Sequence, residues 1–168
     1  MRRSGPMGPT ATDPDSTRPS EAFSTAIVND INLAARAHTP VLITAAPDHA
    51  LSIARVIATG GRGDCTPEVL ICDPTAGDDV LAAMADHTLT SPEDHAPILL
   101  LKEVQGLTTS DQAAVLKCLD RQQKERSGRA PRVIASTSID LFGCVERGTF
   151  DAQLFYRLNA IHIAVPSR

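Results

Sequence analysis

Short apolar runs alternate along the chain with segments whose apolar residues recur at helical spacing. The runs are continuous rather than interrupted by polar residues, which is typical of strands buried on both faces of a sheet. The predicted strands are 40–44, 69–72, 98–104, 133–135 and 161–165. The predicted helices are 20–37, one around 53–57, one around 80–84, 110–126 and one around 154–158. This alternation predicts an α/β fold, with a parallel sheet of about five strands between two helix layers.

Local signals mark the ends of two predicted helices. A glycine pair at 60–61 follows the second helix, and glycine commonly ends a helix. Thr109 and Gln112 have the spacing of a capping box at the start of the longest predicted helix, and Gly128 follows its end. These signals give both helices lengths that fit between neighbouring strands.

The first twenty residues differ in composition from the rest. Residues 1–20 hold four prolines, two glycines and six serines or threonines, with too little apolar surface to offset the entropy of ordering. We expect a disordered tail at 1–20 and one α/β domain at 21–168. The tail lacks the apolar core of a signal peptide, and no apolar run in the chain approaches about 18 residues. We therefore expect a cytoplasmic protein that does not enter a membrane.

Charge and cysteine content narrow the functional classes. The 168 residues carry a net charge of −4, only 3% are aromatic, and Lys and Arg form no stripe, which argues against direct DNA binding. The four cysteines form no CxxC pair, so we expect reduced thiols rather than a zinc site. The acid–histidine pairs at 86–87 and 94–95 fall in a predicted loop without the rigid spacing that a metal needs, and no metal is expected.

Three motifs in the second half of the chain carry a family resemblance. Residues 98–104 read ILLLKEV, residues 132–138 read RVIASTS, and residues 148–159 read GTFDAQLFYRLN. They resemble the Walker B strand, the sensor I strand and the arginine-finger segment of the AAA+ domain of sigma-54-dependent transcriptional activators. The resemblance covers most of 21–168, because VLIT at 41–44 is similar to the strand before the family's P-loop. It implies a three-layer P-loop-NTPase-like fold with a site for ATP and magnesium.

The segment at the position of the P-loop departs from the family pattern. A P-loop uses backbone N–H groups of glycines to surround phosphates, a Lys for the terminal phosphates and a Ser or Thr for magnesium. Residues 45–52 read AAPDHALS and contain neither Gly nor Lys. Ala45, Pro47, Asp48 and His49 therefore stand at degenerate P-loop positions, where Pro47 has no N–H group and Asp48 is negative. We expect no cofactor, with ATP and magnesium bound only if the altered site still holds them.

Other positions with catalytic roles in the family are changed as well. Lys102 stands where the family has the Asp that is linked to magnesium, while Glu103 matches its catalytic Glu. Ser138 replaces the sensor I Asn, which orients water near the γ-phosphate. Each residue also has a simpler interpretation. Glu103 is then a strand-end carboxylate paired with Lys102 or Lys117, and Ser138 is a turn residue.

The resemblance also concerns contacts with other proteins. The family has two arginines that reach into a neighbouring subunit's ATP site; Asp151 replaces the first, and Arg157 matches the second. The alternative for Arg157 is a salt bridge at a helix end. Residues 73–97 contain no GAFTGA hairpin, which is the family's contact with the sigma factor. The chain ends at 168, before the helical lid of the family, so we expect a truncated AAA+ α/β domain.

Three hypotheses about function follow from these residues. The first is a catalytically degenerate regulator, a pseudo-ATPase, that contacts an intact AAA+ activator or another protein of the transcription machinery. The second is a residual ATP-binding ATPase that uses Glu103 and Arg157. The third is an α/β module for another small ligand, lined by the acidic segment 73–97 together with Ser52, Asp73 and Ser138. The first is preferred, so enzyme activity is left open with a non-enzyme favoured.

Overall fold

A computed structural model of the chain describes residues 25–60, 68–84, 97–124 and 131–166. Its centre is a sheet of five parallel strands, which are β1 (Val41–Thr44), β2 (Val69–Cys72), β3 (Ile98–Leu101), β4 (Arg132–Thr137) and β5 (Ile161–Ala164). Their order across the sheet is β2-β3-β4-β1-β5. β1 therefore lies between two strands from the C-terminal part of the chain.

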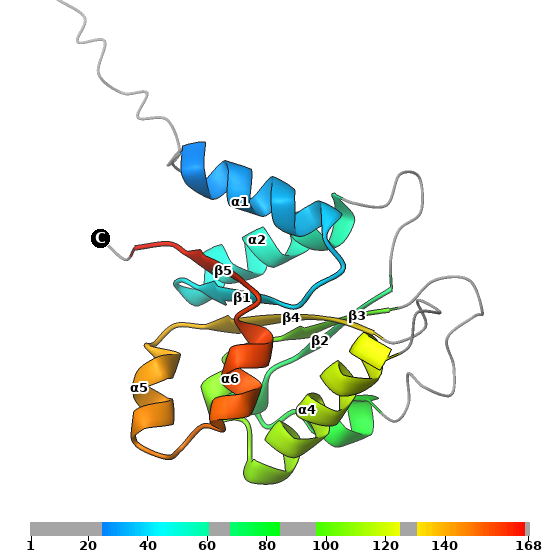
Figure 1. Ribbon diagram of the computed structural model, residues 1–168, viewed down its shortest axis with the longest axis vertical. Coiled ribbons are helices and arrows are strands. Elements are labelled where there is room, and N and C mark those ends of the chain that lie inside the picture. Colours follow the sequence, from blue (N-terminus) through cyan, green and yellow to red (C-terminus); the bar gives the residue numbers. More distant parts are fainter. Residues whose placement is uncertain (1–24, 61–67, 85–96, 125–130, 167–168) are drawn as a thin grey trace, which may run out of the picture.

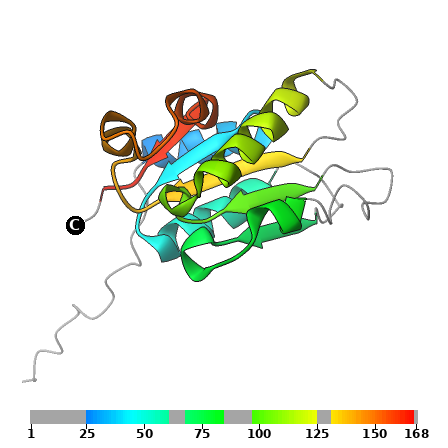
Figure 2. The ribbon, with the colours of Figure 1, turned by 90° about the horizontal axis from the view of Figure 1, so that it is seen from below.

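Helices cover both faces of this sheet (Figure 1). The first face carries α1 (Thr25–Arg36) and α2 (Pro47–Thr59), and the second carries α4 (Thr109–Lys124), α5 (Leu141–Glu146) and α6 (Ala152–Leu158). Figure 2 is viewed from the side of the second layer. The strands lie behind α4, which is yellow-green, and α6, which is red-orange. Two 3-10 helices, η1 (Pro74–Ala76) and η2 (Val104–Gly106), follow β2 and β3. The predicted three-layer α/β fold with a five-stranded parallel sheet is confirmed.

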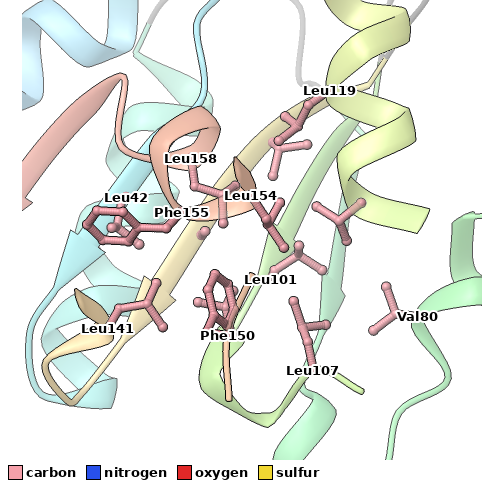
Figure 3. Packing of buried hydrophobic residues seen from close by; sticks show 14 of the residues in the cluster. Leu42, Val80, Leu101, Leu107, Leu119, Leu141, Phe150, Leu154, Phe155 and Leu158 are labelled. Carbon is pink, nitrogen blue, oxygen red and sulfur yellow. The ribbon is translucent and has the colours of Figure 1, made fainter. Parts of the chain in front are cut away.

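Alternate residues of each strand face different helix layers, which explains why the strands are apolar throughout. Val41 and Ile43 are fully buried in one cluster with Ile53 of α2. Leu42, between them, belongs to the second cluster with Leu154 of α6 (Figure 3). Two cores, one on each face, therefore hold β1 in place and fix the position of the residues that follow it.

Some element boundaries differ from the prediction. β3 ends at Leu101 and does not extend to Val104, because the chain turns into η2 after Glu103. α2 begins at Pro47, several residues before the periodic pattern indicated. α5 was not predicted, since its six residues offer too few turns for a periodic pattern. No helix among the described residues is long and apolar enough to cross a membrane.

The capping box of α4 lies one residue earlier than predicted. Thr108 N donates to Asp111 Oδ2 at 3.2 Å, and Asp111 N donates to Thr108 Oγ1 at 3.2 Å. The predicted pair Thr109 and Gln112 was wrong because Gln112 is buried and its Nε2 donates to Leu107 O at 3.0 Å. Two successive threonines fit the same pattern, and the sequence alone does not distinguish them.

Several predictions concern residues that the structure does not describe. The tail at 1–20, the glycines at 61 and 128 and the acid–histidine pairs at 86–87 and 94–95 lie outside the described residues. Cys65 also lies outside them, whereas Cys72, Cys118 and Cys144 are buried free thiols. These predictions stay as they were made from the sequence.

Candidate functional site

The segments singled out in the sequence meet at the carboxyl edge of the sheet. β1, β4 and β3 are neighbours, so the residues that follow Thr44, Leu101 and Thr137 lie side by side. Ala45 N donates to Thr137 O at 3.1 Å, which continues the pairing of β1 with β4 past the end of β1. In open α/β sheets this edge is where ligands bind.

β1 passes into α2 almost without a loop. Only Ala45 and Ala46 separate Thr44, the last residue of β1, from Pro47, the first residue of α2. A phosphate-binding loop instead presents a series of backbone N–H groups between strand and helix. Helical pairing begins at once here, since Ala50 N donates to Ala46 O at 2.9 Å. Between β1 and α2 the chain therefore has two residues, Ala45 and Ala46, in place of a longer loop.

The side chains at the start of α2 include a carboxylate and no lysine. Asp48 is exposed in the first turn, where a carboxylate favours the helix dipole but repels a phosphate. His49 is exposed beside it, and Ala45 is buried. Ser52 Oγ donates to Asp48 O at 2.9 Å, so this hydroxyl is bonded to the backbone of its own helix. Pro47 contributes no N–H group.

Lys102 forms an ion pair with the residue that follows β2. Its Nζ lies 2.7 Å from Asp73 Oδ2, and Asp73 Oδ1 accepts hydrogen bonds from Thr75 N and Oγ1 at 3.1 and 2.6 Å. The bond from Lys102, followed by that from Thr75, lowers the pKa of Asp73. The same contact raises the pKa of Lys102. The alternative that paired Glu103 with Lys102 was wrong, because Lys102 is bonded to Asp73 whereas the carboxylate of Glu103 is bonded to Ser138.

Glu103 turns into a pocket of polar groups between β3 and β4. Its side chain is buried, with 8% of the residue exposed. Its Oε2 accepts hydrogen bonds from Ser138 Oγ at 2.6 Å, Ser138 N at 3.3 Å and Gln105 Nε2 at 2.5 Å. Its Oε1 is buried without a hydrogen-bond partner among the described residues. The structure thus brings together two predicted positions, Glu103 and Ser138, through their side chains.

The backbone at Glu103 is unusual. Its φ of 46° and ψ of 55° lie in the left-handed region, and no other described non-glycine residue has a positive φ. For an L-residue this conformation costs about 1–2 kcal/mol. The surrounding hydrogen bonds therefore hold a strained turn that starts η2.

Two members of this pocket were missed in the sequence. Thr137 Oγ1 donates to Gln105 Oε1 at 2.8 Å, and Gln105 Nε2 in turn donates to Glu103 Oε2. Thr137 is the fully buried last residue of β4, directly before Ser138. Gln105 lies in η2, two residues after Glu103. The available signal was the buried threonine at a strand end, since a buried hydroxyl needs a partner.

Arg157 of α6 is bonded to α4. Its Nη2 lies 2.7 Å from Asp120 Oδ1, and its Nη1 donates to Gln123 Oε1. The guanidinium therefore has partners within its own chain and does not contact the Glu103 pocket through any bond found among the described residues. Asp151 starts α6, where its Oδ1 accepts a hydrogen bond from Leu154 N at 2.7 Å. A carboxylate suits this position, because it satisfies an N–H group at a helix N-terminus.

Several aspartates lie at or near helix starts on the carboxyl edge. Each accepts a hydrogen bond from a backbone N–H group at a helix start: Asp73 from Thr75, Asp79 from Ala82, Asp111 from Thr108 and Asp140 from Phe142. Three of these aspartates, together with Asp78, act on the buried thiol of Cys72. Burial, and then the charges of Asp78, Asp111, Asp73 and Asp79, raise its pKa to about 11. N–H groups at these helix starts, which can attract anions, are bonded to the chain's own acids, whereas α2 has no such side-chain cap.

No group of three or more His, Cys, Asp or Glu side chains that would hold a metal ion exists within the described ranges. The residues that the third hypothesis placed in a ligand site have separate partners. Ser52 is bonded within α2, Asp73 to Lys102, and Ser138 to Glu103. The polar side chains of these three residues are therefore hydrogen-bonded within the chain itself.

Sequence comparison identifies similar proteins over part of the chain. A model of the sigma-54 interaction domain matches residues 20–167. The regulatory protein AtoC of Escherichia coli (strain K12) is 40% identical over 74 residues, which are 40% of this chain and 16% of that protein. The phenol regulator MopR of Acinetobacter guillouiae is 36% identical over 78 residues, which are 43% of this chain and 14% of that protein. The matches thus span a small part of these relatives.

Solved structures share the fold. NtrX from Brucella abortus has a TM-score of 0.68 and 23% identity, covering 88% of this chain and 38% of that chain. The P-loop NTPase domain of a sigma-54 transport activator from E. coli has a TM-score of 0.62 and 18% identity, covering 85% of this chain and 94% of that chain. A RuvB mutant of Thermotoga maritima has a TM-score of 0.59 and 16% identity, covering 85% of this chain and 45% of that chain. Such likenesses show the P-loop NTPase fold.

Proposed function

The chain belongs to the sigma-54 interaction domain family, and we propose that it acts in sigma-54-dependent transcription control through protein contacts, without binding or hydrolysing ATP. In this proposal the domain is a catalytically degenerate member. It keeps the sheet and the helix layers of the family and contacts an intact AAA+ activator or another protein of the transcription machinery.

The observation that carries the proposal is the direct passage of β1 into α2. The two residues between Thr44 and Pro47 leave no room for the loop of N–H groups that holds a polyphosphate. Asp48 adds a negative charge where phosphates would lie. Without that loop, residues elsewhere at the edge have no nucleotide to act on.

The other family positions support the same proposal. The ammonium of Lys102 is neutralised by Asp73. Glu103 is buried and bonded to Ser138, so it does not present a carboxylate to an attacking water molecule. Arg157 is held by Asp120 on the same chain rather than extended toward a neighbouring molecule. Catalysis of phosphoryl transfer needs a carboxylate for the metal, a group that orients the attacking water and a cation that faces the nucleotide, and these three residues do not supply them.

The alternative is a residual nucleotide site. It draws on NtrX, which has been solved in complex with ADP and with ATP. The likeness to NtrX rests on 23% identity and concerns the fold. The charge of Asp48 opposes this alternative, because it lies in the first turn of α2, the helix whose start would face the phosphates.

Calorimetric titration with Mg-ATP tests the proposal directly. The purified chain is expected to release no binding heat at nucleotide concentrations up to the millimolar range. The matched control replaces residues 45–52 by a loop of the pattern G-x-x-x-x-G-K-S and Lys102 by Asp, which supplies the missing cradle and the metal-side carboxylate. Micromolar binding of Mg-ATP by the unaltered chain would overturn the proposal.

The protein-contact part of the proposal needs its own experiment. The purified chain is titrated into an intact sigma-54 activator, and the activator's ATPase rate and assembly state are followed. We expect a change in one of them that saturates with added chain. If neither changes at any ratio, regulation of an activator by contact is excluded.

A further inference from the structure

Aromatic side chains gather on one surface of the molecule. The chain has four Phe, one Tyr and no Trp. Three of these five rings meet on α5 and α6, with centroid distances of 5.7 Å between Phe142 and Phe155 and 5.3 Å between Phe155 and Tyr156. Phe155 is buried, while Phe142 is 43% and Tyr156 66% exposed. We call these three residues the aromatic surface.

Packing in the hydrophobic core accounts for only one of these three rings. Phe155 belongs to the buried cluster that also contains Leu42 and Leu158 (Figure 3). Phe142 and Tyr156 do not belong to that cluster, but the ring of each contacts the ring of Phe155. Exposed apolar residues that are scattered singly need no explanation, whereas joined aromatic rings at a surface are typical of binding sites.

Carboxylates lie around the aromatic surface. Asp140 starts α5, and its Oδ1 accepts a hydrogen bond from Phe142 N at 3.1 Å. Glu146 is exposed one turn after Phe142, on the same side of α5. Asp151 starts α6, and Arg147 is the one cation among the residues that join the two helices. Residues 140–157 hold three acids and two arginines, and Arg157 is already paired with Asp120 of α4, so the remaining charge is negative and favours a positively charged partner.

We propose that the aromatic surface of α5 and α6 docks a basic segment of a partner protein, in which Arg or Lys lies beside apolar side chains. The apolar side chains of the segment cover Phe142 and Tyr156. Its cations lie over the exposed ring faces and near Glu146, so that cation–π attraction and ion pairing act together. The inference rests on the proposed function, because it names the surface and the partner chemistry for a protein that acts by contact.

A selection from random peptides tests this surface without assuming a partner. A phage library of peptides about a dozen residues long is selected on the full chain and depleted on a variant with Phe142→Ser and Tyr156→Ser. We expect the enriched sequences to combine Arg or Lys with Leu, Ile or Phe. Enrichment of acidic sequences, or no enrichment over the double variant, would overturn the inference.

A synthetic peptide from the selection then gives the affinity. A peptide without Tyr or Trp leaves Tyr156 as the sole tyrosine in solution, so its fluorescence reports directly on the surface. Phe142→Ser is expected to weaken binding about tenfold and Glu146→Gln about threefold. The matched control is Leu33→Ser on α1, which removes a side chain of 61% exposure from the other face of the sheet and is expected to leave binding unchanged.

Two further measurements separate the possible failures. Circular dichroism confirms that each variant keeps its melting temperature, so that loss of binding is not loss of the fold. Sedimentation of the unaltered chain decides whether a second copy covers the surface; a dimer that Phe142→Ser dissociates would contradict a basic partner. Mg-ATP binding is measured separately, so a chain that binds ATP and the peptide overturns the proposed function alone.

Discussion

The β1–α2 junction and the ends of β3 and β4 lie side by side at the carboxyl edge, but their chemistry differs. At the junction, Ala45 and Ala46 lead straight into a helix, and the pairing is between backbone groups. At β3 and β4, Glu103 and Ser138 are bonded to each other through their side chains. Polar residues at a strand end therefore need not face a ligand, since burial makes them stabilise one another.

The largest expected effect comes from removing the hydrogen bonds between the ends of β3 and β4. Glu103→Ala removes the buried carboxylate that accepts hydrogen bonds from Ser138 and Gln105. We expect the free energy of unfolding to fall by about 3 kcal/mol, because hydrogen bonds to a charged group are lost. Urea denaturation followed by circular dichroism measures it. A loss below about 1 kcal/mol would mean that the pocket does not hold the strand ends together.

A second substitution at the same position separates the hydrogen bonds from the backbone strain. Glu103→Gly loses the same carboxylate, but glycine adopts a φ of 46° without the steric cost of a Cβ atom. The glycine variant should be more stable than the alanine variant by about 1 kcal/mol. Equal stabilities in the same urea experiment would argue that the left-handed turn is not strained.

The Lys102–Asp73 pair gives a pH-dependent prediction. The pKa of Asp73 is lowered below its ordinary 3.8, so its stabilisation is complete above that value and is lost as the pH falls through the folded pKa. The pKa of Lys102 is raised above 10.5. The stabilisation that Lys102 contributes is therefore complete below pH 10.5 and is lost as the pH rises through the raised pKa.

Comparison with Asp73→Asn isolates this pair, since Asn also caps a helix start well. Between those two pH values the unaltered chain should be more stable than the variant by about 1 kcal/mol. In strong acid, below the lowered pKa of Asp73, the difference should vanish. Urea midpoints measured across this pH range check the sign, and a difference that grows in acid would contradict it.

The smallest effect is expected at the junction. Asp48→Ala removes an exposed carboxylate whose stabilising interaction is with the dipole of α2. The free energy of unfolding should fall by about 0.5 kcal/mol and less in high salt. The melting temperature at low and high salt measures both. A loss as large as that of Glu103→Ala would erase the distinction between the two regions.

Continuous apolar runs were sufficient to predict the strands and the helix layers, because burial on both faces requires them. The order of the strands was not in those runs. It depends on pairings such as Val41 with Ile134 and Ile161, which join distant parts of the chain. The end of β3 was also misjudged at Val104, since the turn at Glu103 follows from tertiary hydrogen bonds rather than from local sequence.

The candidate site could be predicted residue by residue but not as an arrangement. Glu103 and Ser138 were named from separate motifs, and their contact follows from the neighbouring positions of β3 and β4. The partner of Lys102 was missed because Asp73 is 29 positions earlier and no periodicity links the two. Gln105 carried no motif at all, and only the geometry of η2 places its amide between Thr137 and Glu103.

The place of β1 between β4 and β5 has a consequence for folding. Both of its neighbours, β4 and β5, come from the last 37 of the 168 residues, since β4 begins at Arg132. During synthesis β1 therefore keeps both backbone edges unpaired until most of the chain has left the ribosome. Contacts of such sequence separation slow folding and prolong the exposure of apolar strands. The nascent chain, more than the finished domain, is where this fold is vulnerable to aggregation.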